Sequence, residues 1–132
     1  MPNSFVHVEL NTADVATAKK FYRGLFDWKL EDVRRPDMIY TMIDVGKGVG
    51  GGMMNTPMPD APTQWLPYVL VDDAAKAIAK ARKLGATIVV ESKTVMGMGT
   101  LGIFVDPTGA MLAVWEAVRK APAKRRAKSR KK

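Results

Sequence analysis

The stretch Phe5-Val6-His7-Val8-Glu9-Leu10 decides the first element of the fold. Val6, Val8 and Leu10 face one side of an extended chain, and the residues between them face the other. An alternation of apolar and polar residues with a period of two predicts a β-strand with an apolar back. It also places His7 and Glu9 on the same, opposite face.

The residues that follow predict a helix. Asn11-Thr12-Ala13-Asp14 offers side chains that cap helix N-termini, so the helix should run from about Asp14 to Leu25. Apolar residues recur along it at helical spacing and predict a buried stripe. That stripe consists of Val15, Ala18, Phe21, Tyr22 and Leu25.

Three further strands are predicted after the helix, over 28–33, over 38–45 and from about 49 to 54. The segment 55–64 contains three prolines, which disfavour regular structure, and it is interpreted as a linker. The pattern then restarts with a strand over 65–71 and a helix that begins at Asp72-Asp73. This second helix ends near Leu84, because Gly85 follows it.

Strands over 87–90, 100–105 and 111–117 complete the second half. The helix starts Asp14 and Asp73 lie 59 residues apart, as do the helix-end leucines Leu25 and Leu84. The sequence therefore predicts an α+β fold of tandem βαβββ modules. Each module is a curved, mixed four-stranded sheet with one helix, and the two enclose a cavity.

The predicted domain covers residues 1–118, with module one at 5–54 and module two at 65–117. Residues 97–102 match the G-x-G-x-x-G pattern of dinucleotide-binding proteins. In those proteins a helix follows the pattern, whereas here a strand follows it. This stretch is interpreted as a loop over the mouth of the cavity.

Composition removes several classes of site. The chain has no cysteine and one histidine, His7, which excludes disulfides, thiolate metal sites and histidine-rich metal centres. The net charge is +8, but nine of the 21 Lys and Arg residues lie in 119–132, which leaves 12 against 13 Asp and Glu elsewhere. The excess therefore belongs to a basic tail, which is predicted to be disordered when free.

No apolar run approaches the roughly 18 residues of a membrane span, and the N-terminal residues lack the features of a secretory signal. A cytoplasmic location is expected.

The motifs together resemble those of the vicinal oxygen chelate superfamily, which includes glyoxalase I, bleomycin-resistance proteins and extradiol dioxygenases. The first module carries the resemblance in 7–14, in Phe21-Tyr22 and in 25–28. In the second module, Val71-Asp72-Asp73, 83–86 and Asp106-Pro107-Thr108-Gly109 complete the pattern. The resemblance covers 5–117 and implies two βαβββ modules around a shared cavity, often completed in a dimer.

Metal-dependent members of this family place one ligand on the first and one on the last strand of each module. His7 matches the first position, whereas the other three fall at Leu66, about Gly51 and Ala113, which offer no side-chain ligand. Glu9 could add a ligand, and Asp44 another. No metal and no cofactor are predicted, because a divalent ion needs three or more suitable ligands.

The predicted cavity face is mostly apolar and aromatic, which suits a planar or hydrophobic small molecule. His7 and Glu9 are its candidate catalytic residues. Its candidate ligand-binding residues are Phe5, Tyr40, Met42, Met53, Leu66, Tyr68, Phe104, Met111 and Trp115. The same residues are also compatible with an ordinary core.

Three functions compete. The first is a metal-independent small-molecule binding protein, as the resemblance to bleomycin-resistance proteins implies, acting as a homodimer. The second is an enzyme, a glyoxalase-like lyase, isomerase or dioxygenase that uses His7 and Glu9. The third is a nucleic-acid-associated protein in which residues 119–132 bind nucleic acid or another acidic surface.

Overall fold

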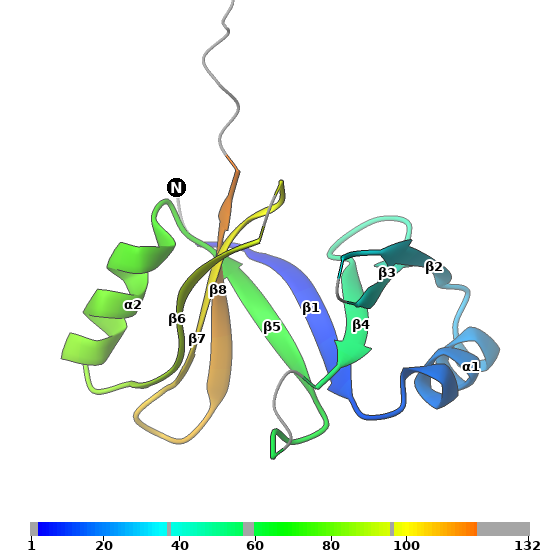
Figure 1. The fold of residues 1–132 in the computed structure, drawn as a ribbon, viewed down its shortest axis with the longest axis horizontal. Coiled ribbons are helices and arrows are strands. Elements are labelled where there is room, and N and C mark those ends of the chain that lie inside the picture. Colours follow the sequence, from blue (N-terminus) through cyan, green and yellow to red (C-terminus); the bar gives the residue numbers. More distant parts are fainter. Residues whose placement is uncertain (1–2, 37, 57–59, 96, 119–132) are drawn as a thin grey trace, which may run out of the picture.

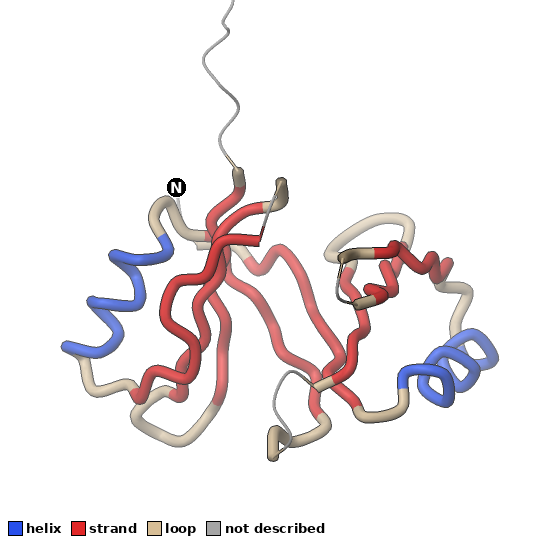
Figure 2. Tube along the Cα trace, in the orientation of Figure 1, coloured by secondary structure: helices blue, strands red, loops and turns tan. Residues whose placement is uncertain are grey.

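The computed structural model describes residues 3–36, 38–56, 60–95 and 97–118. The basic tail 119–132 and residues 57–59 of the predicted linker lie outside the described residues. Ten elements follow one another (Figures 1 and 2). In chain order they are β1 (Phe5–Thr12), α1 (Val15–Leu25), β2 (Lys29–Arg34), β3 (Ile39–Asp44), β4 (Gly51–Asn55), β5 (Gln64–Leu70), α2 (Ala74–Lys83), β6 (Thr87–Val95), β7 (Gly99–Val105) and β8 (Met111–Ala117).

All eight strands form one open sheet with the order β2-β3-β4-β1-β5-β8-β7-β6. Strand β1 runs parallel to β4 and antiparallel to β5, and β5 runs parallel to β8. Figure 1 shows β1 and β5 in the middle of the twisted sheet, with α1 and α2 at opposite ends. The predicted α+β class, with four strands and one helix from each half, is confirmed.

Strand register assigns each side chain to one of two faces. The first, called the helix face, carries Val8 and Leu10 from β1 and Val114 from β8. Leu10 belongs to the core that contacts α1, and Val114 to the core that contacts α2, so both helices pack on this face. The opposite face is called the site face, and it carries His7 and Glu9.

Both helices begin as the sequence predicts. The Asp14 side chain accepts a hydrogen bond from Thr17 N at 3.0 Å, and the Asp73 side chain accepts one from Lys76 N at the same distance. Each carboxylate thus satisfies a backbone donor that has no partner within the helix. Gly85 follows α2 with φ +104°, a conformation that favours glycine and ends the helix.

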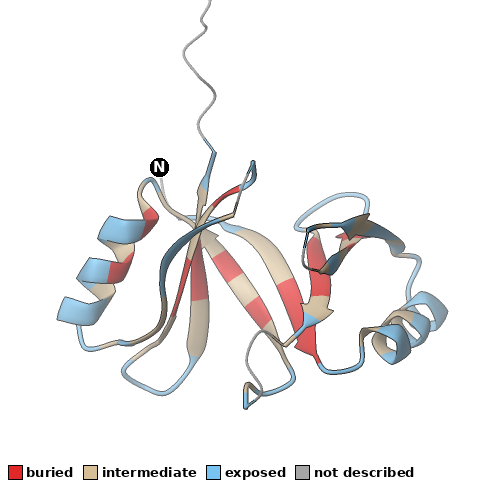
Figure 3. Ribbon diagram, in the orientation of Figure 1, coloured by how far each residue is buried: buried red, intermediate tan, exposed pale blue. Residues whose placement is uncertain are grey.

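The two helices differ in burial (Figure 3). In α2, Ala74 and Ile78 are buried, and Ile78 packs over Gly102, where a Cβ atom would lie 2.4 Å from Ile78 Cγ1. None of the 11 residues of α1, all of which the structure describes, is buried. The prediction that Phe21 and Leu25 are buried is therefore wrong, because the side of α1 that packs on the core is formed by Val15, Ala18 and Tyr22.

The prediction of a loop over 97–102 is also wrong for most of these residues. Residues from Gly99 onward belong to β7, which pairs with both β6 and β8. Gly99 lies over the indole of Trp115, and a Cβ atom there would be 2.7 Å from the ring. Gly99 and Gly102 therefore allow β7 to lie close to the side chains of Trp115 and Ile78.

Candidate functional site

A buried carboxylate lies at the centre of the site face. Glu9 is 7% exposed and accepts three hydrogen bonds from side chains. Tyr40 donates to Oε1 at 2.9 Å, while Asn11 and Tyr68 donate to Oε2 at 2.9 and 3.1 Å. A buried carboxylate is costly unless it is hydrogen-bonded, and these three donors satisfy both of its oxygens.

Four strands contribute to this arrangement. Glu9 and Asn11 lie two residues apart on β1, and Tyr68 comes from the neighbouring β5. Tyr40 on β3 reaches across β4, where its ring covers Gly52. A Cβ atom at Gly52 would lie 2.1 Å from the Tyr40 hydroxyl oxygen, so only glycine leaves room for the ring.

His7 joins the cluster through Tyr40. Its Nε2 atom lies 2.7 Å from the Tyr40 hydroxyl oxygen. Burial lowers the pKa of His7 below its ordinary value, and the nearby charge of Glu9 only partly opposes this effect, so the neutral ring is favoured. Because Tyr40 uses its single proton to donate to Glu9, it accepts from a proton on His7 Nε2.

This tautomer leaves Nδ1 of His7 with a lone pair, and no described residue donates a hydrogen bond to it. The result is a chain of hydrogen bonds from His7 through Tyr40 to Glu9. Such a chain can support a histidine that takes a proton at Nδ1, because the positive charge that forms is stabilised by the carboxylate at its far end.

The two tyrosines remain protonated over a wide pH range. Burial raises the pKa of both Tyr40 and Tyr68, and the charge of Glu9 and the hydrogen bonds to it raise the pKa further. Both phenols therefore act as permanent donors to Glu9. Tyr68 also meets the His7 ring edge-on, with ring centroids 5.4 Å apart.

Most predicted members of the cavity face share the face of Glu9. Leu66 lies directly opposite Glu9, and Tyr68 lies opposite His7. Met42 pairs with Gly52 beside Glu9, and Tyr68 and Leu66 form a buried cluster against which Met111 and Trp115 pack. Met42, Met111 and Trp115 are only partly buried.

Three of the predicted ligand-binding residues do not lie on the site face. Met53 is fully buried with Leu10 on the helix face, because Glu9 is opposite Gly52 and the prediction was one residue off. Phe104 packs on the core under α2, because its neighbour Ile103 pairs with Ala113 on the site face. Phe5 is 60% exposed.

The position of Phe5 results from a β-bulge. The register between β1 and β5 shifts between Phe5 and His7, so the alternation of faces breaks there. Val6, which the alternation places on the back of the strand, packs instead with the cluster of Leu66 and Tyr68.

Sequence reasoning missed Asn11. Asn11 continues the alternation of His7 and Glu9, so its position on β1 was a usable signal that its capping interpretation obscured. For Gly52 the signal is the glycine-rich stretch 46–52, which predicts bends and close approach near the cavity. The sequence does not show that the ring of Tyr40, from another strand, is the group that approaches Gly52.

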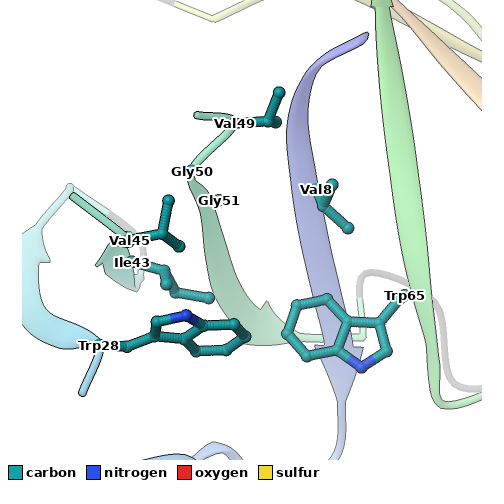
Figure 4. A pocket seen from close by; sticks show the side chains of 8 residues that line it. All are labelled: Val8, Trp28, Ile43, Val45, Val49, Gly50, Gly51 and Trp65. Carbon is teal, nitrogen blue, oxygen red and sulfur yellow. The ribbon is translucent and has the colours of Figure 1, made fainter. Parts of the chain in front are cut away.

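A hollow lies on the helix face, away from Glu9 (Figure 4). Its volume is about 300 Å³, and its lining is apolar. The indoles of Trp28 and Trp65 both line it and meet edge-on, with centroids 6.2 Å apart. The residues that line it are Val8, Trp28, Ile43, Val45, Val49, Gly50, Gly51 and Trp65, and we call it the tryptophan groove.

Comparison with known proteins decides the family. The model of the Glyoxalase/Bleomycin resistance protein/Dioxygenase superfamily matches residues 4–114. The chain belongs to this superfamily. The resemblance inferred from the motifs is confirmed.

Of two curated relatives, one is named as a glyoxylase and the other for anthracycline biosynthesis. The chain is 32% identical over 120 residues to "Putative glyoxylase CFP32" of Mycobacterium tuberculosis, which covers 85% of this chain and 45% of that protein. It is 29% identical over 129 residues to "Anthracycline biosynthesis protein DnrV" of Streptomyces peucetius, covering 86% and 47%. The chain thus spans about half the length of the curated relatives it matches.

Solved structures show the same glyoxalase-superfamily fold. A hypothetical protein, BH1468 from Bacillus halodurans, superposes with a TM-score of 0.69 at 12% identity, over 92% of this chain and 99% of that one. Methylmalonyl-CoA epimerase from Mycobacterium tuberculosis superposes with a TM-score of 0.64 at 16% identity, over 87% and 88%.

The residues do not fit the metal centre that the superfamily implies. Leu66 and Ala113 occupy two of the four family positions, and Gly52, rather than the predicted Gly51, lies beside Glu9. Asp44 is exposed and accepts a hydrogen bond from Gly46 N in its own turn. Among the described residues, no three His, Cys, Asp or Glu side chains gather as a metal ion requires.

Within the described part of the chain, neither helix is long and apolar enough to cross a membrane.

Proposed function

We propose that this superfamily member is a cytoplasmic protein that binds a small hydrophobic or planar organic molecule on the site face without a metal ion. The observation that supports this most directly is the environment of Glu9. Three protein donors already satisfy its oxygens, so it provides a fixed negative charge beneath the site rather than a free metal ligand.

The residues around Glu9 favour a ligand with a flat apolar surface. Trp115 meets Tyr68 edge-on at 6.4 Å, and both are rigid aromatic groups. Met42 and Met111 are flexible and can adapt to an irregular ligand. His7 Nδ1 adds one acceptor that can orient a donor on the ligand.

The relatives named for anthracycline biosynthesis suggest a suitable probe, an anthracycline, whose fused-ring system is planar and largely apolar. Titration of the full chain should alter tryptophan emission. Trp115→Ala should weaken binding about tenfold, since stacking is worth roughly 0.5–1.5 kcal/mol and about 1.4 kcal/mol corresponds to tenfold. Trp28→Phe, on the helix face, is the matched control and should leave affinity unchanged.

Glu9→Gln tests the charge at the same site. It should change which probes bind, for example by reducing the preference for cationic ones, more than it changes the affinity for neutral ones. Short acyl-CoA compounds and thiol conjugates complete the panel. If no compound perturbs emission, and Trp115→Ala is merely destabilised, these residues are ordinary core and the binding proposal is wrong.

Metal independence has its own test. Elemental analysis of the purified protein should find no stoichiometric zinc, nickel or iron, and chelators should leave probe affinity unchanged. About one metal ion per chain would overturn this part of the proposal and favour an enzyme.

The alternative function is a glyoxalase-like lyase, isomerase or dioxygenase. The observation that favours it is the hydrogen-bond chain from His7 through Tyr40 to Glu9, which supports a general base at Nδ1. Tyr40→Phe interrupts this chain without touching the ligand's aromatic contacts. In an enzyme, turnover should fall with binding retained, whereas in a simple binding protein only affinity can change.

The second alternative is nucleic-acid binding through residues 119–132. Deleting them removes nine cations. Retention on heparin should fall sharply and melting temperature should change little. A melting temperature many degrees lower would show that the tail is packed.

A further inference from the structure

The carboxylate of Glu9 is buried without a cation beside it. Its three hydrogen-bond donors, one amide and two phenols, are all neutral groups. The ion pairs that the described residues form are Lys19–Asp32 and Arg82–Glu91, and neither involves Glu9. Buried charges are normally paired as well as hydrogen-bonded, so Glu9 leaves a negative charge without a counter-ion in the middle of the site face.

Neighbouring side chains do not supply the missing positive charge. Burial lowers the pKa of His7, so its ring is neutral, and its Nε2 proton is used on Tyr40. Arg35, just after β2, contacts the sulfur of Met98 at 3.0 Å. Other described charged side chains that the strands place on this face are Lys29, Glu31, Asp44 and Lys93. All four are exposed on strands that are not neighbours of β1, where solvent screens their charges.

Polar atoms that accept hydrogen bonds are left over around Glu9. A carboxylate only accepts, so the amide nitrogen of Asn11 faces Glu9 and its Oδ1 atom points away. No described residue donates to Asn11 Oδ1 or to His7 Nδ1, although Asn11 is only 6% exposed. These two acceptors lie on either side of Glu9 along β1. A ligand that complements them brings hydrogen-bond donors.

Aromatic rings surround the same position. Tyr40 stacks with His7 at 6.2 Å between centroids, and Trp115 meets Tyr68 edge-on at 6.4 Å. The face of an aromatic ring is negative and attracts a cation, most strongly for tryptophan. A neutral flat molecule can stack on these rings, but it leaves the charge of Glu9 without a counter-ion.

We infer that the ligand of the site face is a planar aromatic cation with N–H donors, bound with its ring against Trp115 and its positive charge toward Glu9. This preference depends on the proposed binding function and narrows it, since neutral and anionic planar molecules should bind less well. Glu9 acts through its charge rather than through a direct hydrogen bond, because protein donors already occupy both of its oxygens.

Three acridines with the same ring system separate charge from stacking. At neutral pH, 9-aminoacridine is a cation, acridine is uncharged and acridine-9-carboxylate is an anion. Calorimetric titration of the full chain should give an affinity for 9-aminoacridine about tenfold or more above that for acridine, because the rings and the carboxylate both attract the cation. Acridine-9-carboxylate should bind most weakly.

Matched variants identify the charge that causes the preference. Glu9→Gln removes the charge with little change of shape, so the affinity for 9-aminoacridine should fall about tenfold, to that of acridine. Glu31→Gln makes the same change at an exposed position of the site face and should preserve the preference. Trp115→Ala should weaken both acridines, whereas Trp28→Phe, in the tryptophan groove, should weaken neither.

Several outcomes would overturn the charge preference. Equal affinities for the three acridines, or tightest binding of the carboxylate, would do so and leave the binding function intact. A preference for 9-aminoacridine that persists in Glu9→Gln with normal circular dichroism would do the same. If Glu9→Gln does not fold, an affinity for 9-aminoacridine that Trp115→Ala leaves unchanged places the cation elsewhere and overturns it. If no acridine binds, the preference is overturned, and the anthracycline titration decides the binding function separately.

Discussion

The two helices have almost the same length and cap, and both pack on the same face of the sheet, yet they are held differently. Helix α2 buries Ala74 and Ile78 against β6, β7 and β8, with Ile78 fitting over Gly102. Helix α1 buries no residue of its own. The difference shows that an amphipathic stripe predicts which side of a helix is apolar, but not what covers that side.

The largest expected effect is on α2. Ile78→Ala should lower the free energy of unfolding by about 3 kcal/mol, because it removes a buried side chain and leaves a cavity. Leu25→Ala should cost roughly 0.5 kcal/mol in the single chain, because Leu25 is 56% exposed. Urea denaturation at several protein concentrations measures both.

The dependence on protein concentration also distinguishes the stability losses of these two variants. The loss from Ile78→Ala should be the same at every concentration, whereas the loss from Leu25→Ala should grow with concentration if α1 is covered by a second chain. Equal costs for the two variants at all concentrations would contradict the contrast between the helices.

A second comparison concerns the two tyrosines that donate to Glu9, one from each half of the chain. Tyr40→Phe removes two hydrogen bonds, to Glu9 and His7, and should cost about 2–3 kcal/mol. Tyr68→Phe removes one and should cost about 1.5 kcal/mol. Thermal or urea unfolding at pH 7 measures the loss of stability in each variant. A larger loss for Tyr68→Phe than for Tyr40→Phe would mean that the hydrogen bond between Tyr40 and His7 contributes nothing to stability.

The same tyrosines predict a pH dependence. Because the fold raises their pKa above the ordinary value of 10.0, the unfolded chain loses these protons first as pH rises. Their contribution is complete below pH 10 and is lost above it. Unfolding measured between pH 8 and 11 should show this loss, and the Tyr40→Phe/Tyr68→Phe double variant should show much less of it.

Smaller effects than at the tyrosines are expected at the helix caps. Asp73→Ala should cost about 1 kcal/mol, because α2 is tied to the core and its unsatisfied donors destabilise the whole fold. Asp14→Ala should cost less globally, since α1 can fray without opening a core. Hydrogen exchange should show α1 amides exchanging faster in Asp14→Ala, with α2 unchanged. Faster exchange throughout the sheet would argue against independent fraying of α1.

Much of the fold could be predicted because its signals are local. The caps Asp14 and Asp73, the end of α2 at Gly85 and the strand β8 all depend on side chains within a few residues of one another. Predictions failed where an element depends on residues that are distant in the sequence. Strand β6 extends to Val95, beyond the predicted 90, because pairing with β7 continues where the apolar pattern stops.

The candidate site was predicted only in part. Alternation alone placed His7 and Glu9 together on β1, and it carried Leu66 and Tyr68 to the same face. It failed for Phe5, because a bulge shifts the register by one residue and exchanges the faces. Met53 was misassigned for the same kind of reason, since strand register depends on the neighbouring strand.

By itself, the sequence determined the α+β class, the helix caps, the superfamily motifs and the presence of a histidine and a glutamate on one strand face. These follow from spacing along the chain, where each residue acts on its near neighbours. Only the tertiary structure decided that Tyr40 bridges His7 and Glu9 over Gly52, and that α1 leaves Phe21 and Leu25 exposed. Such outcomes depend on which distant strands meet, and side-chain periodicity carries no information about the partner on the other side of a contact.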